Sequence, residues 1–152
     1  MAETTIGYSS AQDVEPWLMR FLRANVEGVD FYCIPPDTQT TSPTTPACFI
    51  YMQARRGLTR VTDEATVGLA YYVGQGETIS EAVERMALII GVATSEAVAL
   101  ASGSPIVMPH TDGQLEFTLA EQATPAHAKP IYYAAVTLDV YRKTALLTTD
   151  IY

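Results

Sequence analysis

His110 and Asp112 are two residues apart and closely follow Ser102 and Ser104, so this stretch holds the residue types of a hydrolytic site. An imidazole can take the proton of a serine hydroxyl, and a carboxylate can orient the imidazole. The sequence lacks the G-x-S-x-G turn that exposes a nucleophilic serine between a strand and a helix. Asp112-Gly113 is instead common in hairpin turns. We therefore expect a polar hairpin tip, with a small hydrolase whose site lies near His110 and Asp112 as an alternative function.

Gly74-Gln75-Gly76 follows a strand-like segment and precedes a helix-like one, which is where glycines let backbone amides approach a pyrophosphate. The third glycine of that dinucleotide fingerprint is missing, because its position holds Ile79. A tight turn in which a glycine takes a positive φ explains the pattern better. The sequence therefore predicts no cofactor site here.

Cys33 and Cys48 are the two cysteines of the chain, and neither has a second cysteine or a histidine at the spacing of a zinc site. We expect both to be buried free thiols. The carboxylates are spread along the chain, so neither the paired acids of a glycosidase nor a calcium-binding loop is indicated. The sequence thus predicts no catalytic residue and no metal site.

Arg55, Arg56 and Arg60 form the single basic cluster in a chain that has 9 Lys and Arg against 17 Asp and Glu, a net charge of −8. That balance argues against binding nucleic acid by neutralising phosphates. We expect the cluster in a polar connection between two strands, where it is either a solvated turn or a contact to an acidic partner. The predicted long helix displays Glu81 and Glu84. The hypothesis is therefore a subunit interface made by these five residues.

The surface is lean in charge, because only 17% of the residues are charged against about 25% in a typical soluble domain. We expect partners to cover part of it. The apolar run 86–109 is not expected to span a membrane, since Glu96 lies near its middle and serine, glycine and proline interrupt it. The segment MAETTIGYSS has neither the basic nor the apolar region of a signal peptide, so the sequence predicts a soluble protein.

Hydrophobic spacing predicts the elements that must position these residues, all within a single domain, 1–152. A first amphipathic helix is indicated by apolar residues at i, i+3, i+4, i+7 and i+8, namely Val14, Trp17, Leu18, Phe21 and Leu22. Thr78 and Glu81 have the spacing of a capping box that starts a second helix, in which Glu81 should also pair with Arg85. Strands are predicted at 29–34, 47–54, 65–73, 106–109, 115–119 and 131–142, the last of them central because it is the longest. The segment 35–47 predicts a flexible loop, and 144–152 a further strand or an arm that docks on a neighbour.

Four segments in this order suggest a family. They are the helix DVEPWLMRFL, the strand ACFIYMQARRG followed by an acidic turn and ATVGLAYYV, the helix TISEAVERMALII, and the closing strand KPIYYAAVTLDVYRK. Over roughly residues 13–143 the chain resembles tail terminator (tail completion) proteins of long-tailed bacteriophages. The resemblance implies an α+β fold in which two helices pack on a mixed or antiparallel sheet.

The resemblance also implies a function. Members of that family are structural virion proteins rather than enzymes, and they form a homohexameric ring that caps the tail tube, ends its growth and offers a docking face to the head-side connector. The implied partners are other copies of the chain, the tail tube protein and the head–tail connector protein, with DNA passing through the ring without specific binding. The implied location is the head-proximal end of the virion tail, after assembly in the host cytoplasm. A head-side stopper or connector ring is an alternative of the same structural class.

Overall fold

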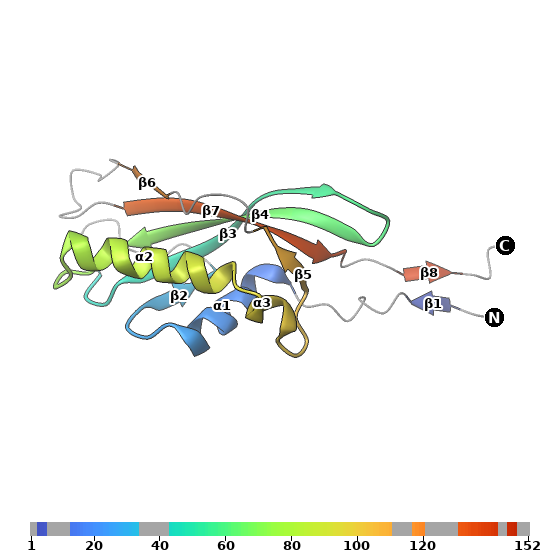
Figure 1. The fold of residues 1–152 in the computed structure, drawn as a ribbon, viewed down its shortest axis with the longest axis horizontal. Helices are drawn as coiled ribbons and strands as arrows, with labels where there is room; N and C mark the ends of the chain where they lie inside the picture. Colours follow the sequence, from blue (N-terminus) through green and yellow to red (C-terminus); the bar gives the residue numbers. More distant parts are fainter. Residues whose placement is uncertain are drawn as a thin grey trace.

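The computed structural model describes residues 3–5, 13–33, 43–110, 117–120, 131–142 and 146–148, and it places side chains in 13–33, 43–110 and 131–142. Helices and strands alternate irregularly along the chain, as Figure 1 shows. In order they are β1 (Glu3–Thr5), α1 (Val14–Asn25), β2 (Asp30–Tyr32), β3 (Ala47–Gly57), β4 (Thr62–Tyr72), α2 (Ile79–Ala93), α3 (Ala97–Leu100), β5 (Ile106–Pro109), β6 (Phe117–Ala120), β7 (Ile131–Tyr141) and β8 (Leu146–Thr148).

The main sheet has six strands in the order β2-β3-β4-β7-β5, with β6 also paired to β7. β2 runs parallel to β3, and the other pairs are antiparallel, so the sheet is mixed and the fold is α+β. β7 has β4 on one side and both β5 and β6 on the other, which confirms its predicted central position. β8 does not extend this sheet, because it pairs with β1 in a separate antiparallel ribbon.

The helices all lie on one side of the main sheet, and the core fills the space between (Figure 1). The predicted stripe of α1 is confirmed: Val14, Trp17, Leu18 and Leu22 are buried, and the Trp17 ring stacks on Phe21 with ring centroids 5.2 Å apart. On β7 buried residues alternate with exposed or partly exposed ones from Tyr132 onward, as expected for a strand that buries one side. On β4 the alternation holds from Thr62 to Val67, whereas Val67 to Tyr71 are all buried.

The second helix begins as predicted. The Thr78 hydroxyl accepts a hydrogen bond from the Glu81 amide, and the Glu81 carboxylate accepts one from the Thr78 amide, which completes the capping box. The expected pair of Glu81 with Arg85 does not form, because Arg85 reaches Glu77 instead.

The predicted hairpin between 106–109 and 115–119 is wrong. β5 pairs with Leu138 to Val140 of β7, and β6 pairs with Ile131 to Ala134 of the same strand, so both are successive segments of one sheet edge. Asp112 and Gly113 lie outside the described residues. The two segments pair with β7 and not with each other, because β7 is long enough to pair with both along one edge.

Strands β3 and β4 are longer than predicted, so Arg55 and Arg56 lie on β3 and not in a connection between strands. A register shift between Met52 and Ala54 marks a bulge on β3. The predicted loop 35–47 lies mostly outside the described residues, and its last residue, Ala47, begins β3. In its described part Pro43 O accepts a hydrogen bond from the Gln75 amide at 2.8 Å.

None of the described helices has both the length and the apolar character needed to cross a membrane.

Candidate functional site

The side of the main sheet opposite the helices, called the outer face below, is a candidate interaction surface. Val67 and Leu69 of β4 point into the core, so Gly68 and Ala70 point the other way. No helix in the described ranges covers this side, as Figure 1 shows. A sheet face without a covering layer is unusual unless it is polar or bound by a partner.

The outer face carries an aromatic cluster, defined here as Phe49, Tyr51, Tyr72 and Tyr133, and all four side chains are partly exposed. The rings of Phe49 and Tyr51 stack with centroids 5.1 Å apart. The Tyr51 ring lies over Gly68, where an added Cβ would come 2.3 Å from Tyr51 Cζ, so any other residue at this position would displace the ring. Burial raises the pKa of the Tyr51 and Tyr72 hydroxyls, and the nearby Tyr133 raises both further. Aromatic side chains of this kind are enriched at protein interfaces.

One end of the outer face is charged. Arg56 Nε donates to Glu64 Oε1 at 2.9 Å, and His110 Nε2 lies 2.7 Å from Asp139 Oδ1. The hydrogen bond from Arg56 lowers the pKa of Glu64. Glu64 and Asp139 are direct partners across β4 and β7, so this charged end spans three neighbouring strands.

Arg55 is engaged on the other side of the sheet. Its Nε donates to Asp63 Oδ2 at 2.9 Å, and Arg142 Nε donates to Asp63 Oδ1 at 3.0 Å. Burial raises the pKa of Asp63, but the hydrogen bonds from the two arginines outweigh it and leave the pKa below its ordinary value. Arg55 also donates to the backbone oxygen of Tyr141 at 3.2 Å. Arg55 therefore ties the two strands together near the turn of the β3–β4 hairpin and links them to the end of β7.

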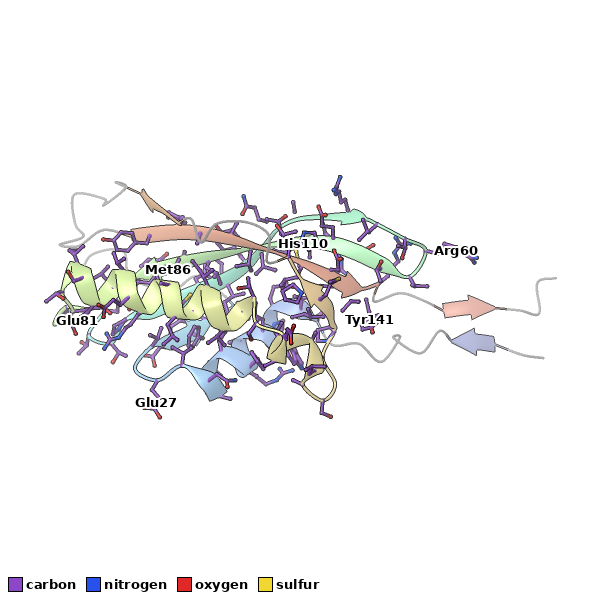
Figure 2. The ribbon with its side chains drawn as sticks, viewed as in Figure 1. Glu27, Arg60, Glu81, Met86, His110 and Tyr141 are labelled. Atoms are coloured by element: carbon purple, nitrogen blue, oxygen red, sulfur yellow. The ribbon has the colours of Figure 1, made fainter. Side chains whose placement is uncertain are left out.

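The five predicted interface residues are thus divided. Arg55 and Arg56 are held in ion pairs within the chain, and Glu81 is held in its capping box. Arg60 lies at the exposed tip of the β3–β4 hairpin, and Glu84 lies on the exposed side of α2. Neither side chain forms a hydrogen bond or an ion pair with another of the described residues. Figure 2 shows Arg60 and Glu81 at opposite ends of the molecule. The structure does not bring the basic and acidic residues together within one subunit.

The turn before α2 is occupied by a buried carboxylate. Glu77, whose side chain is 2% exposed, accepts hydrogen bonds from Tyr71 Oη at 2.5 Å, from the Gly74 amide at 3.1 Å and from Arg85 Nη1 at 2.6 Å. A phosphate bound at this turn would be repelled by the Glu77 carboxylate. Neither Gly74 nor Gly76 has the expected positive φ, so that prediction is wrong. At Gly74 a glycine is favoured by close packing instead, because an added Cβ would lie 2.8 Å from the Pro46 ring.

Of the two serines in the hydrolase alternative, Ser102 is exposed, and Ser104 has hydrogen-bonding partners other than His110. Ser104 Oγ donates to the backbone oxygen of Val98 at 2.7 Å and accepts from the Ile106 amide at 3.1 Å, so it stabilises the turn before β5. His110 contacts Asp139, whereas Asp112 lies outside the described residues.

Cys33 and Cys48 are both free thiols, as predicted. Cys48 is fully buried, which raises its pKa strongly, whereas Cys33 is only partly buried. Neither is placed to react as an exposed thiolate.

Sequence reasoning missed Glu64 and Asp139 as neighbours of His110. Each lies at an outward position of an alternating strand, which the sequence does show. Their proximity depends on the register of β4 against β7, and no local signal fixes that register.

A comparison of the chain with protein-family models finds no match, and a comparison with curated proteins finds none either.

Proposed function

We propose that this protein is a structural subunit that assembles head to tail into a closed ring, and that the ring caps the tube of a bacteriophage tail, ends its growth and forms the docking face for the head-side connector. The proposal combines the resemblance of residues 13–143 to tail terminators with the surfaces described above. The tail tube protein and the connector protein are its proposed partners.

The observation that carries the proposal is the aromatic cluster on the uncovered outer face. Phe49, Tyr51, Tyr72 and Tyr133 give the chain a group of partly exposed aromatic side chains outside its core, and burying such side chains is a main source of binding energy at interfaces. The small share of charged residues supports the same proposal.

The charges of Arg60 and Glu84 suggest how neighbouring subunits are oriented in the proposed ring. Arg60 projects from the hairpin tip at one end of the molecule, and α2 begins at the other end, where Figure 2 shows Glu81 and where Glu84 follows one turn later. Complementary charges at opposite ends favour heterologous contacts, which close into a ring when the rotation between subunits allows it. A ring with a net charge of −8 per subunit would also repel DNA in its lumen.

The first experiment measures assembly. Light scattering after size-exclusion chromatography, with negative-stain electron microscopy, is expected to show rings of the purified protein, alone or after tail tubes are added. The paired replacement Tyr72→Ser with Tyr133→Ser should abolish them. Leu100→Ser, which removes a side chain 81% exposed on α3, is the matched control and should leave the rings intact.

A charge exchange tests the orientation. Arg60→Glu should weaken assembly, and Glu84→Arg in the same chain should restore it, because the pair is then reversed across the interface. Glu27→Arg is the control for restoration, since Glu27 is exposed on another part of the surface (Figure 2) and should not rescue. Failure of Glu84→Arg to rescue would contradict the head-to-tail arrangement.

Added tail tubes decide the role of the ring. Rings seated on tube ends that stop further elongation would support a terminator. Rings that bind the connector but leave tubes growing would identify the alternative, a head-side stopper. Monomers that bind neither would refute both.

A further inference from the structure

Three side chains from three neighbouring strands converge at the charged end of the outer face. Glu64 of β4 and Asp139 of β7 are direct cross-strand partners, and His110 follows β5 on the other side of β7. One ligand atom from each residue lies within 4.8 Å of the other two. They are partly buried, with side-chain exposures of 20% for Glu64, 34% for His110 and 15% for Asp139.

The backbone holds these residues in place. Glu64 and Asp139 lie in continuous ladders, and the His110 amide donates to the Thr137 oxygen at 2.9 Å. Residues on paired strands of a sheet are positioned more precisely than residues on loops, so little rearrangement is needed to bring the three ligand atoms around one ion.

Two carboxylates in this group lie beside one permanently charged cation, Arg56. Two carboxylates directly opposite each other on antiparallel strands repel. Arg56 neutralises Glu64 only in part, because its side chain is 72% exposed and an exposed ion pair contributes little. Within the described ranges, Asp139 has His110 as its one hydrogen-bonding partner. A cation between the carboxylates would remove the repulsion.

We propose that Glu64, His110 and Asp139 bind a divalent transition-metal ion, with Zn²⁺ as the reference ion. Two carboxylates and an imidazole suit Zn²⁺ or Mn²⁺, whereas Mg²⁺ and Ca²⁺ prefer oxygen ligands alone. Arg56 engages Oε1 of Glu64, and the second carboxylate oxygen is the ligand for the ion. Three protein ligands leave a coordination position for water.

The ion would tie the end of β5 to both β4 and β7, at the point where the edge segments β5 and β6 are separated. This inference does not depend on the ring proposal, because the site lies within one subunit.

Isothermal titration of the full chain with ZnCl₂ tests the site. The wild-type protein should bind one ion, and Zn²⁺ should raise its melting temperature. His110→Ala and Asp139→Asn should each weaken binding at least about tenfold, as losing a ligand costs no less than losing a residue that supports one. Circular dichroism of both variants checks the fold, and Asp139→Asn keeps the side-chain shape if His110→Ala does not fold.

Two controls separate this site from other zinc ligands in the chain. His127→Ala removes the other histidine, and Cys33→Ser removes the partly buried thiol; both should bind Zn²⁺ like the wild type. Arg56→Gln should strengthen binding, because it removes a positive charge from the ligand Glu64. No binding by the wild type, or unchanged affinity in His110→Ala and Asp139→Asn, would overturn the proposal.

Discussion

Replacing Glu77 by glutamine tests how the turn between β4 and α2 is held. The carboxylate is buried and accepts hydrogen bonds from a phenol, a backbone amide and a guanidinium. Glutamine has the same shape, but it carries no charge and one of its two terminal atoms is a donor. At least one of the three donors then loses its acceptor, and Arg85 loses its counterion.

The expected cost follows from this burial. Removing one partner of a buried ion pair costs about 3–5 kcal/mol, since the other charge stays behind without compensation. The Arg85 side chain is 34% exposed and can be partly hydrated, so we expect the lower end, about 3 kcal/mol. A domain of ordinary stability, about 5–15 kcal/mol, stays folded at 25 °C after such a loss.

Urea unfolding followed by the fluorescence of the single tryptophan measures this cost. Glu84→Gln is the matched control, because Glu84 is exposed on the helix that follows this turn, and it should change the free energy of unfolding by less than about 0.5 kcal/mol. Arg85→Met with Glu77→Gln should cost less than the sum of the two single changes. A loss below about 1 kcal/mol for Glu77→Gln would show that the buried carboxylate is not the acceptor that holds this turn.

Three further predictions concern the helices and the ion pairs near the turn of the β3–β4 hairpin. Trp17→Ala should lower the free energy of unfolding by about 3–5 kcal/mol in urea, because Trp17 is 6% exposed; a red-shifted native emission in the wild type would contradict this burial. Thr78→Ala removes the cap of α2 and should cost about 1 kcal/mol in the same assay, whereas an equal cost for Ser80→Ala would deny the cap a special role. The pKa of Asp63 is lower in the folded state, so its pairs stabilise the protein above about pH 4 and this stability is lost as the pH falls through the folded-state pKa. The free energy of unfolding should therefore fall below about pH 4 in the wild type and fall less in Asp63→Asn; parallel pH profiles would refute this.

The helices and most strands could be predicted because their signals are local. The stripe from Val14 to Leu22 fixes the buried side of α1, and Thr78 with Glu81 fixes the start of α2. The length of the segment 131–142 indicated a central strand, which β7 is. These features need only the spacing of residues within one element.

The predictions that were wrong concern features that depend on contacts between residues far apart in the sequence. Arg55 and Arg56 continue β3 because Asp63 and Glu64 of β4 supply their partners, although arginine next to glycine locally suggests a turn. The bulge near Met52 shifts the alternation of β3 by one residue, so Arg55 points to the helix side of the sheet and Arg56 to the outer face. Arg85 forms its ion pair with Glu77, and the Glu81 carboxylate takes part in the capping box.

The charged end of the outer face could not be found for the same reason. Glu64, His110 and Asp139 are far apart in the sequence and meet only when β7 is inserted between β4 and β5. The sequence around each of these three residues contains no signal that points to the other two.

The place of β7 in the sheet has a consequence for how the chain folds during its synthesis. β7 joins β4 to β5 and β6, yet it leaves the ribosome after all of them. Until it emerges, one edge of β4 has no partner and the apolar side of the sheet is covered only in part. Pairing β4 with β7 also requires residues 73–130 to close as a loop, which slows folding. Neighbouring nascent chains on one messenger would then expose open β4 edges at the same time, and a chaperone that shields these edges until β7 emerges should raise the yield of folded protein.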